Sequence, residues 1–439
     1  YDSSNTDVTW CNSVSNNGFV SSGDVLQFAL DQDAGTLFIG NNNTWFRAGG
    51  TRDTFSNATT VGRRTFPTGI SRRFFVGRGG SFAETYALNF GQQANTFSGS
   101  STTFNAAANG FFVYTPPTGY KALNQDNLDD TASKITAWAW IKNRDASSDH
   151  MLFDRVRGIG KDLHSNSTAA EATNANTVQR FLQRGVQVGN DSTVNTAGNS
   201  FVLWQWLLGD SATTGSTNTD GSVNTTVIAA DAGHFSVVKG TTGSSGATFG
   251  HGLGAAPDLI INKNLTDGSS NWLVYNSSSG ATFYLGLNLS SSKFGPGSTI
   301  FGTEPDSTVF TLGSFFNSVE CINYCLRSVP GVCKVGVYQV NNTTDKTLGP
   351  YVSLGFKPRW IMFKGLDNAS QWTIYDTGKE PFNVNDHIFQ YANLQSADQA
   401  FAANDIDMLS DGFKIRTDTN NEPNNGSGEY LYVAMADIA

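Results

Sequence analysis

The sequence predicts an all-β protein built from tandem antiparallel β-sandwich domains, and three observations support this prediction. Short apolar runs are separated by tracts of Ser, Thr, Asn and Gly, and the chain holds 46 glycines. Several runs, such as residues 23–31, alternate apolar and polar side chains as a half-buried strand does. One two-strand pattern also occurs three times, and its period of about 100 residues indicates repeated domains.

The repeated pattern is a pair of apolar runs joined by a polar loop, which is the signature of a β-hairpin. In the first copy Lys142 precedes Asp154 by 12 residues, and in the third Lys364 precedes Asp376 by the same 12. The equal spacing, together with a middle copy of the same two-run pattern, predicts three related β-modules. The three copies are residues 137–154, 256–276 and 357–376.

Composition narrows the class of protein. Charged residues make up only 15% of the 439, while 31 Phe and 9 Trp supply large apolar groups for several cores. A net charge of −9 argues against nucleic-acid binding by the whole surface. No apolar stretch is long enough to span a membrane, so we expect no membrane insertion.

The four cysteines do not form a disulfide scaffold or a zinc pattern, and we expect no metal and no cofactor. Cys321 and Cys325 lie four residues apart in a strand-like run, roughly 13 Å at strand rise, which is too far for a bond. Cys325 and Cys333 flank a turn and could face each other across a hairpin. We expect buried, inert thiols, with the state of that last pair left open.

The first domain, residues 1–125, reads as β throughout residues 1–120 and carries a resemblance. The order GDVLQFALD, AGTLFIGNNNTW, LNFGQ and FFVYTPPTGYKALN is similar to the C-terminal two-thirds of a SPRY-type domain. The resemblance implies a two-sheet, concanavalin-like antiparallel sandwich. The early strands of such a domain are missing from the match, so we expect a partial SPRY-like domain.

A basic insert lies inside this first domain. Five arginines fall within 16 residues of an otherwise acidic chain, which predicts a contact with a neighbouring subunit or an anion. A solvated loop is the alternative, and nucleic acid is the less favoured partner. The arginines are Arg63, Arg64, Arg72, Arg73 and Arg78.

The remaining chain divides into three β-repeats, at residues 126–224, 225–331 and 332–439. Residues 209–224 are rich in Gly, Ser and Thr and predict a linker. Residues 169–183 predict one short helix or an irregular loop. The other apolar runs predict strands, including residues 235–239, 309–313, 320–325 and 430–436.

The repeats resemble a domain of predicted virion proteins from marine bacteriophages. The matching stretches are WIKNR…HMLFDRVRG…LHSNSTAAE, GHGLGAAPDLIINKN…NWLVY, GFKPRWIMFK…QWTIYD and GFKIRT…GEYLYVAMAD. The resemblance implies a phage structural protein on the virion exterior, with a tail fibre or another appendage as the common assignment.

The sequence contains no persuasive catalytic constellation, so we expect no enzyme. A glycosidase needs two carboxylates about 5–9 Å apart, and the glutamates here are scattered. His150 and Asp154 could form an acid–base pair. However, Trp272 and Trp372 stand in the place of His150 in the sister repeats, which makes a packing position the simpler interpretation.

The ends of the repeated hairpin allow two hypotheses. Trp272, Tyr275, Trp372 and Tyr375 could bind a ligand such as a sugar by stacking and hydrogen bonds. Alternatively, Lys364 pairs with Asp376 across the hairpin while Trp360 and Trp372 fill the core. We favour the structural interpretation, because a feature present in every copy serves the shared fold.

The sequence therefore predicts a non-enzymatic virion protein, in a tail fibre or other appendage that contacts the host surface. Its expected partners are other virion proteins, further copies of itself in a homo-oligomer, with a trimer favoured, and a host surface glycan. The alternatives are a capsid-decorating protein and a carbohydrate-binding lectin or glycan-active enzyme.

Overall fold

The computed structural model divides the chain into two compact units, Tyr1–Asp130 and Thr131–Ala439, and each is described by itself. In the first unit it describes only the strands and residue 42. In the second it describes residues 135–183, 185–208, 214–341, 343, 345–379, 388–400, 406–416 and 423–436.

The first unit contains short antiparallel strands. β1 pairs with β2 in the register Ala29↔Phe38, and both side chains are buried. β2 also pairs with β3 and β5, β3 pairs with β4, and β6 pairs with β7. The strands are β1 (Leu26–Asp31), β2 (Thr36–Asn41), β3 (Thr44–Phe46), β4 (Arg52–Asp53), β5 (Arg64–Thr65), β6 (Asn105–Ala107) and β7 (Gly110–Phe112).

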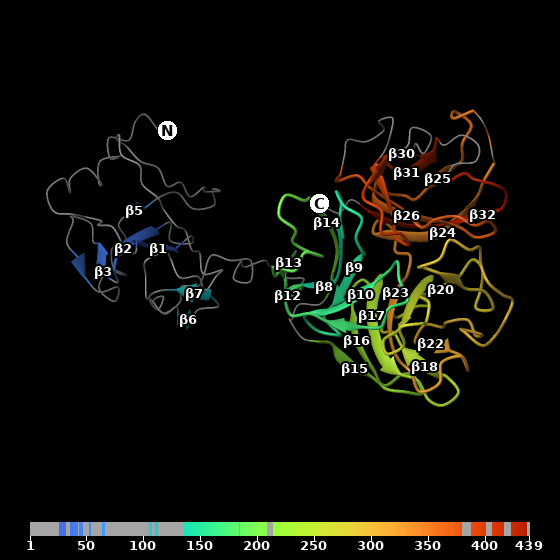
Figure 1. Cartoon of the computed structure of the whole chain (residues 1–439), viewed down its shortest axis with the longest axis horizontal. Coiled ribbons are helices and arrows are strands. Elements are labelled where there is room, and N and C mark those ends of the chain that lie inside the picture. Colours follow the sequence, from blue (N-terminus) through green and yellow to red (C-terminus); the bar gives the residue numbers. More distant parts are fainter. Residues whose placement is uncertain are drawn as a thin grey trace. The chain divides into compact units, whose positions relative to one another are not determined.

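The second unit contains three large sheets, one for each predicted repeat, and we call them and their covering strands modules 1, 2 and 3 (Figure 1). The sheet of module 1 has the order β11-β10-β9-β8-β14. That of module 2 is β15-β16-β17-β23-β19-β20-β21, and that of module 3 is β24-β32-β26-β27-β28-β29.

The strands of the large sheets have the following bounds: β8 (Thr136–Asn143), β9 (Met151–Asp154), β10 (Lys161–His164), β11 (Ala172–Thr173), β14 (Phe201–Leu207), β15 (Ser216–Asn218), β16 (Thr225–Ala229), β17 (Phe235–Thr241), β19 (Leu259–Asn264), β20 (Leu273–Asn276), β21 (Leu285–Gly286), β23 (Glu320–Leu326), β24 (Cys333–Gln339), β26 (Pro358–Gly365), β27 (Thr373–Asp376), β28 (Ile388–Tyr391), β29 (Gln399–Ala400) and β32 (Glu429–Ala436).

A smaller antiparallel sheet accompanies each large one. The small sheets are β12 (Val178–Leu182) with β13 (Gly185–Val188), β18 (Ala247–Gly250) with β22 (Val309–Leu312), and β25 (Tyr351–Ser353) with β31 (Gly412–Ile415) and β30 (Ile406–Leu409). Each module has its own hydrophobic cluster on this side; in module 3 it joins Phe363 to Phe413, 5.3 Å apart between ring centroids.

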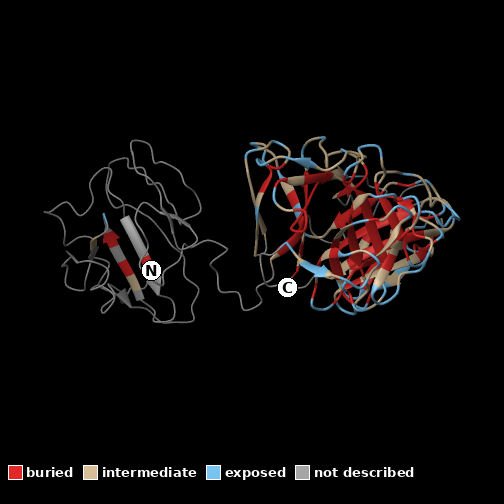
Figure 2. Cartoon of the chain, turned by 90° about the horizontal axis from the view of Figure 1, so that it is seen from below, coloured by how far each residue is buried: buried red, intermediate tan, exposed pale blue. Residues whose placement is uncertain are grey.

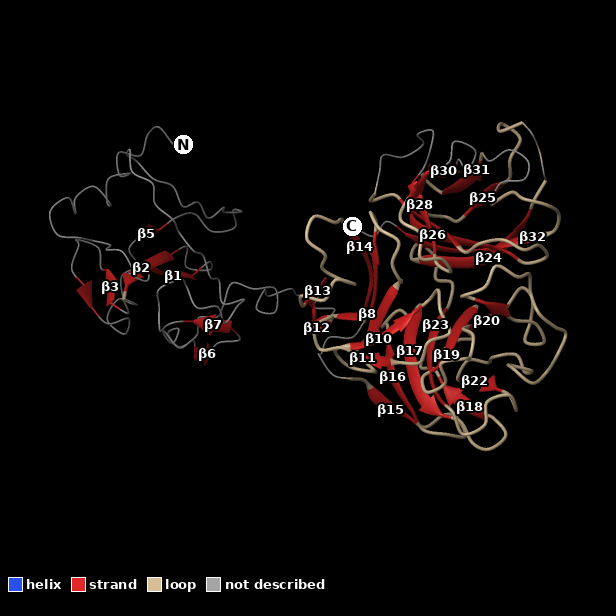
Figure 3. Cartoon of the chain, in the orientation of Figure 1, coloured by secondary structure: helices blue, strands red, loops and turns tan. Residues whose placement is uncertain are grey.

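The predicted fold class is confirmed. Every pairing between named strands is antiparallel, and the described residues contain no helix, as Figure 3 shows. The described part of the chain accordingly has no helix that could cross a membrane.

The opposite faces of the three large sheets meet in one shared core. Trp138 of module 1 stacks on Phe235 and Tyr324 of module 2 at 5.4 and 4.4 Å between ring centroids. Trp206 of module 1 meets Trp360 of module 3 at 6.0 Å. The buried strands at the centre of the unit are red in Figure 2. The modules therefore share a common interior and form one unit.

Several sequence predictions need correction. Residues 169–183 contain strands β11 and β12 in place of a helix or plain loop, and the predicted linker contains β15, which joins the sheet of module 2. Cys321, Cys325 and Cys333 are buried free thiols, so the possible Cys325–Cys333 bond is absent. Burial raises the pKa of the Cys333 thiol to about 11, which keeps it protonated.

Candidate functional site

The residues that recur in the three modules lie where one module meets the next. Trp272 of module 2 donates from Nε1 to the carbonyl oxygen of His164 in module 1, at 2.8 Å. Trp372 of module 3 donates in the same way to Gly286 of module 2, at 2.8 Å. The three modules are thus linked in a fixed direction, from 3 to 2 and from 2 to 1.

His150 links module 1 to module 3 and so closes the contacts between the modules into a ring. It occupies the same place in module 1, and its Nε2 lies 3.0 Å from the carbonyl oxygen of Tyr391 in module 3. Its Nδ1 accepts a hydrogen bond from Trp140 Nε1 at 2.8 Å. A histidine and two tryptophans therefore perform one structural task at three equivalent positions.

An asparagine supports each of these aromatic residues. The backbone N–H groups of His150, Trp272 and Trp372 donate to the side-chain oxygens of Asn166, Asn288 and Asn393, at 2.9, 3.0 and 2.9 Å. Each bond satisfies a backbone donor at the start of a hairpin strand, where a pairing partner is lost.

The recurring lysines are fully buried, and two of them bind across the same junctions. Lys263 Nζ donates to the carbonyl oxygens of Ser270, in its own loop, and Thr168 of module 1, at 2.8 and 2.7 Å. Burial lowers the pKa of Lys263 to about 8, because an apolar interior disfavours the charge. Lys142 is buried in module 1, and its pKa is likewise lowered to about 8 by burial.

Lys364 follows the pattern of Lys263, which corrects one expectation. It donates to the carbonyl oxygens of Ser290 in module 2 and Ser370, at 2.9 and 2.7 Å. Asp376 is paired in the strand register with Trp360, four residues away from Lys364, so the two side chains do not meet across the hairpin. That carboxylate accepts from Trp204 Nε1 of module 1 at 2.9 Å and lies 3.3 Å from Arg359.

The four aromatic residues considered for ligand binding are all buried. Trp272, Tyr275, Trp372 and Tyr375 are each no more than 2% exposed. A ring must present a face to solvent to stack on a sugar, so the structure does not support this site. Both tryptophans belong to the shared core, and Tyr275 donates its hydroxyl to Glu304 at 2.7 Å.

His150 and Asp154 do not form an acid–base pair. His150 is bound as described above, and burial lowers its pKa to about 3, so the ring is neutral near pH 7. Asp154 instead accepts from Tyr324 Oη of module 2 at 2.8 Å and from Arg157 Nε. Although burial opposes the charge, the neighbouring Asp154 raises the pKa of Arg157 above its usual value.

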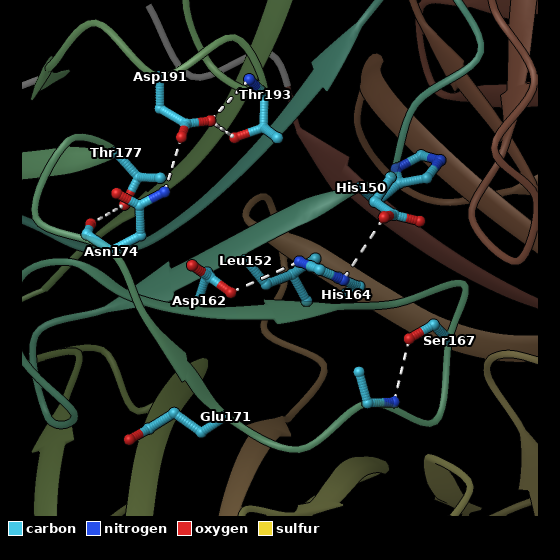
Figure 4. A network of polar contacts seen from close by, with 12 residues as sticks. His150, Leu152, Asp162, His164, Ser167, Glu171, Asn174, Thr177, Asp191 and Thr193 are labelled. Carbon is cyan, nitrogen blue, oxygen red and sulfur yellow. Dashed lines mark hydrogen bonds and ion pairs between the residues drawn. The ribbon is translucent and has the colours of Figure 1, made fainter. Parts of the chain in front are cut away.

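A polar network on module 1 was not predicted from the sequence. His164 lies between two carboxylates, with Nδ1 3.6 Å from Asp149 and Nε2 3.5 Å from Asp162 (Figure 4). The available signal was the alternation Asp162-Leu163-His164, which places Asp and His on one face of a strand. Asp149 lies in a loop, and no local sequence pattern connects it with Asp162 and His164.

Asp149 also ties this network to module 3. It accepts hydrogen bonds from Asn166 Nδ2 at 2.6 Å and Gln395 Nε2 at 2.7 Å. Burial raises the pKa of Asp149, but these bonds and the nearby His164 outweigh it, and the net pKa is lowered. Arg144 binds Asp398 of module 3 at 2.7 Å beside them. This polar cluster therefore fastens the junction between the first and last modules.

Of the five arginines in the basic insert, one lies within the described residues. Arg64 belongs to β5, while Arg63, Arg72, Arg73 and Arg78 lie outside the described residues. Within the described part of the chain, no group of three or more His, Cys, Asp or Glu side chains could hold a metal ion.

The structure defines a class of protein in which three β-modules close around one core. The chain belongs to the family described as Domain of unknown function (DUF7483), whose match covers residues 123–438. The match takes in all three modules. No curated protein and no solved structure matches the chain.

Proposed function

We propose that this chain is a structural protein of a bacteriophage virion, an exterior appendage such as a tail fibre that contacts the host surface. One observation carries the proposal: the recurring residues Trp272, Trp372 and Lys364 bind neighbouring modules in the interior. Such an arrangement favours a rigid body, because its sheets cannot open singly without exposing the shared core.

Two properties of the sequence support the virion setting. Residues 131–439 resemble repeats of marine phage virion proteins, and the chain is low in charge and rich in Gly, Ser, Thr and Asn. The proposed partners are other virion proteins and a host surface glycan, and the proposed assembly is a homo-oligomer, with a trimer favoured.

The test is to locate the chain in purified particles with an antibody and electron microscopy. Label on the tail or its fibres would support the proposal. Label spread over the shell would favour a capsid-decorating protein, for which the arginines at residues 63–78 are the candidate capsid contact. Finding the chain only as a free protein would overturn the virion assignment.

The proposal also holds that the chain is not an enzyme. Asp149 and Asp162 flank His164, so they are the carboxylates to substitute, as the double variant D149N/D162N. We expect host-glycan depolymerisation to be no different from that of the unmodified chain. Loss of such an activity with assembly intact would favour the glycan-active alternative.

A further inference from the structure

Within the described residues, module 1 lacks one strand that both of its sister modules have. In modules 2 and 3, the long strands β23 and β32 lie between two neighbours, β17 and β19 in one case and β24 and β26 in the other. In module 1 the equivalent strand β14 pairs with β8, and among the described residues nothing pairs with its other edge.

The exposure of β14 agrees with a missing neighbour. Leu203 is 36% exposed, whereas its counterparts Asn323 and Tyr432 are 0% and 3% exposed. Phe201 and Gln205 are only partly covered, while all their counterparts are buried. β14 is therefore the most exposed of the three equivalent strands β14, β23 and β32.

The backbone of β14 has groups directed towards this free edge. Arg144 N donates to Ser200 O, and hydrogen-bonded pairs alternate along antiparallel strands. Val202 and Trp204 therefore bond to β8, and the N–H and C=O groups of Phe201, Leu203 and Gln205 point the other way. β14 carries no charge, proline or inward lysine of the kind that protects edge strands.

The sister modules show which kind of strand fits. β17 and β24 place apolar side chains at alternate positions, and Phe235 of β17 reaches Trp138 and Trp206 of the neighbouring module at 5.4 and 5.7 Å. By the same relation, a strand beside β14 would meet Trp360 and Met435 of module 3. Met435 is partly exposed, as expected for a residue beside an unfilled strand position.

In the chain itself, the segment at the equivalent interval already pairs with another strand. β17 begins 24 residues before β19, and β24 begins 25 residues before β26. The same interval before β8 falls on Phe111 and Phe112, which belong to β7 and pair with β6 in the first unit. A second copy's β14 does not fit either, since its Trp204 and Trp206 are packed in that copy's own core.

We propose that the free edge of β14 is a strand-acceptor site for an extended segment of a different protein, with apolar side chains at alternate positions like those of β17 and β24. Main-chain hydrogen bonds would provide affinity, and the alternate apolar side chains would provide specificity. The inference does not depend on the virion assignment.

The experiment uses the full chain and a fluorescent peptide with the sequence of residues 234–242. A peptide of the same composition in scrambled order is the control. Leu203→Pro removes an N–H on the free edge but no bond to β8, and proline is tolerated on edge strands. Leu203→Ala removes the same side chain and keeps the N–H, so the two variants are matched.

The ordered peptide should bind the unmodified chain and L203A, and L203P should weaken binding by at least about tenfold, the equivalent of 1.4 kcal/mol. Thermal unfolding should show that both variants fold. In hydrogen exchange, the amides of Phe201, Leu203 and Gln205 should exchange rapidly alone and slowly with peptide.

Three results would overturn the proposal. Equal binding by L203P and L203A, or no binding to the unmodified chain, would mean that peptide does not use this edge. Protection of the three amides without peptide would mean that the chain fills the site itself. A dimer that L203P disperses would make a second copy the occupant.

Discussion

At the residue scale, Lys263 is a cation in an apolar interior, and it stabilises the fold through the two carbonyl oxygens that it binds. We expect Lys263→Met to lower the free energy of unfolding by about 2 kcal/mol or more, because buried acceptors lose their donor. Denaturant unfolding measures the change.

The matched control is Lys239→Met. Lys239 is partly exposed and forms a surface ion pair with Glu320 at 2.9 Å. Such a pair contributes less than about 1 kcal/mol. Equal effects of the two substitutions would show that the buried lysine does not hold the junction.

His150 should make stability depend on pH. Its pKa is about 3 when folded and 6.5 ordinarily, so between these values the unfolded chain binds more protons. The free energy of unfolding therefore falls on acidification through this window, by up to about 1.4 kcal/mol per pH unit. Unfolding curves from pH 7 to pH 4 should show this loss relative to His150→Gln, which does not titrate. Parallel curves would contradict the assignment.

The sequence predicted the packing role of these residues but not their contacts. Trp272 and Trp372 at the place of His150 indicated a shared structural position. Their acceptors, His164 and Gly286, belong to other modules and lie 108 and 86 residues away in the chain. No local pattern reports partners at such separations.

At the element scale, the asparagine bond to the start of each hairpin strand should matter in every module. We expect Asn393→Ala to destabilise the protein by about 1–3 kcal/mol, because the buried N–H of Trp372 loses its acceptor. Asn393→Asp keeps an acceptor and should cost less. Thermal unfolding of both variants checks this, and equal losses would argue against a role for this bond.

Strands with strong alternation were predicted well, while short polar ones were not. β17, β23 and β32 lie where apolar runs predicted them. β15 consists of Ser-Thr-Asn and looks like a linker, because it is a strand only through its pairing with β16. Tertiary context overrides composition in such cases.

At the scale of the whole unit, the shared core predicts that the three modules unfold together. Trp372→Ala removes a large side chain from the core and should lower stability by about 3–5 kcal/mol. Calorimetry should show one transition for residues 131–439 that shifts as a whole. Separate transitions, with only module 3 affected, would contradict a common core.

The period of the repeats predicted three modules, but not that they share one interior. A repeat of this length suits independent domains equally well, and the faces that meet are distinguishable only in three dimensions. Trp138, Trp206 and Trp360 are ordinary core residues by sequence, yet they come from two modules and lie within one cluster.

The closure of module 1 onto module 3 has a consequence for the order of events at the ribosome. Arg144 cannot meet Asp398, nor His150 the carbonyl of Tyr391, until a further 254 and 241 residues have been synthesised. Part of the apolar faces of modules 1 and 2 therefore stays exposed until module 3 has been synthesised. Long-range contacts of this kind slow folding. Final assembly of the unit thus follows the synthesis of module 3, and a chain that stops before module 3 lacks the contacts that close the ring.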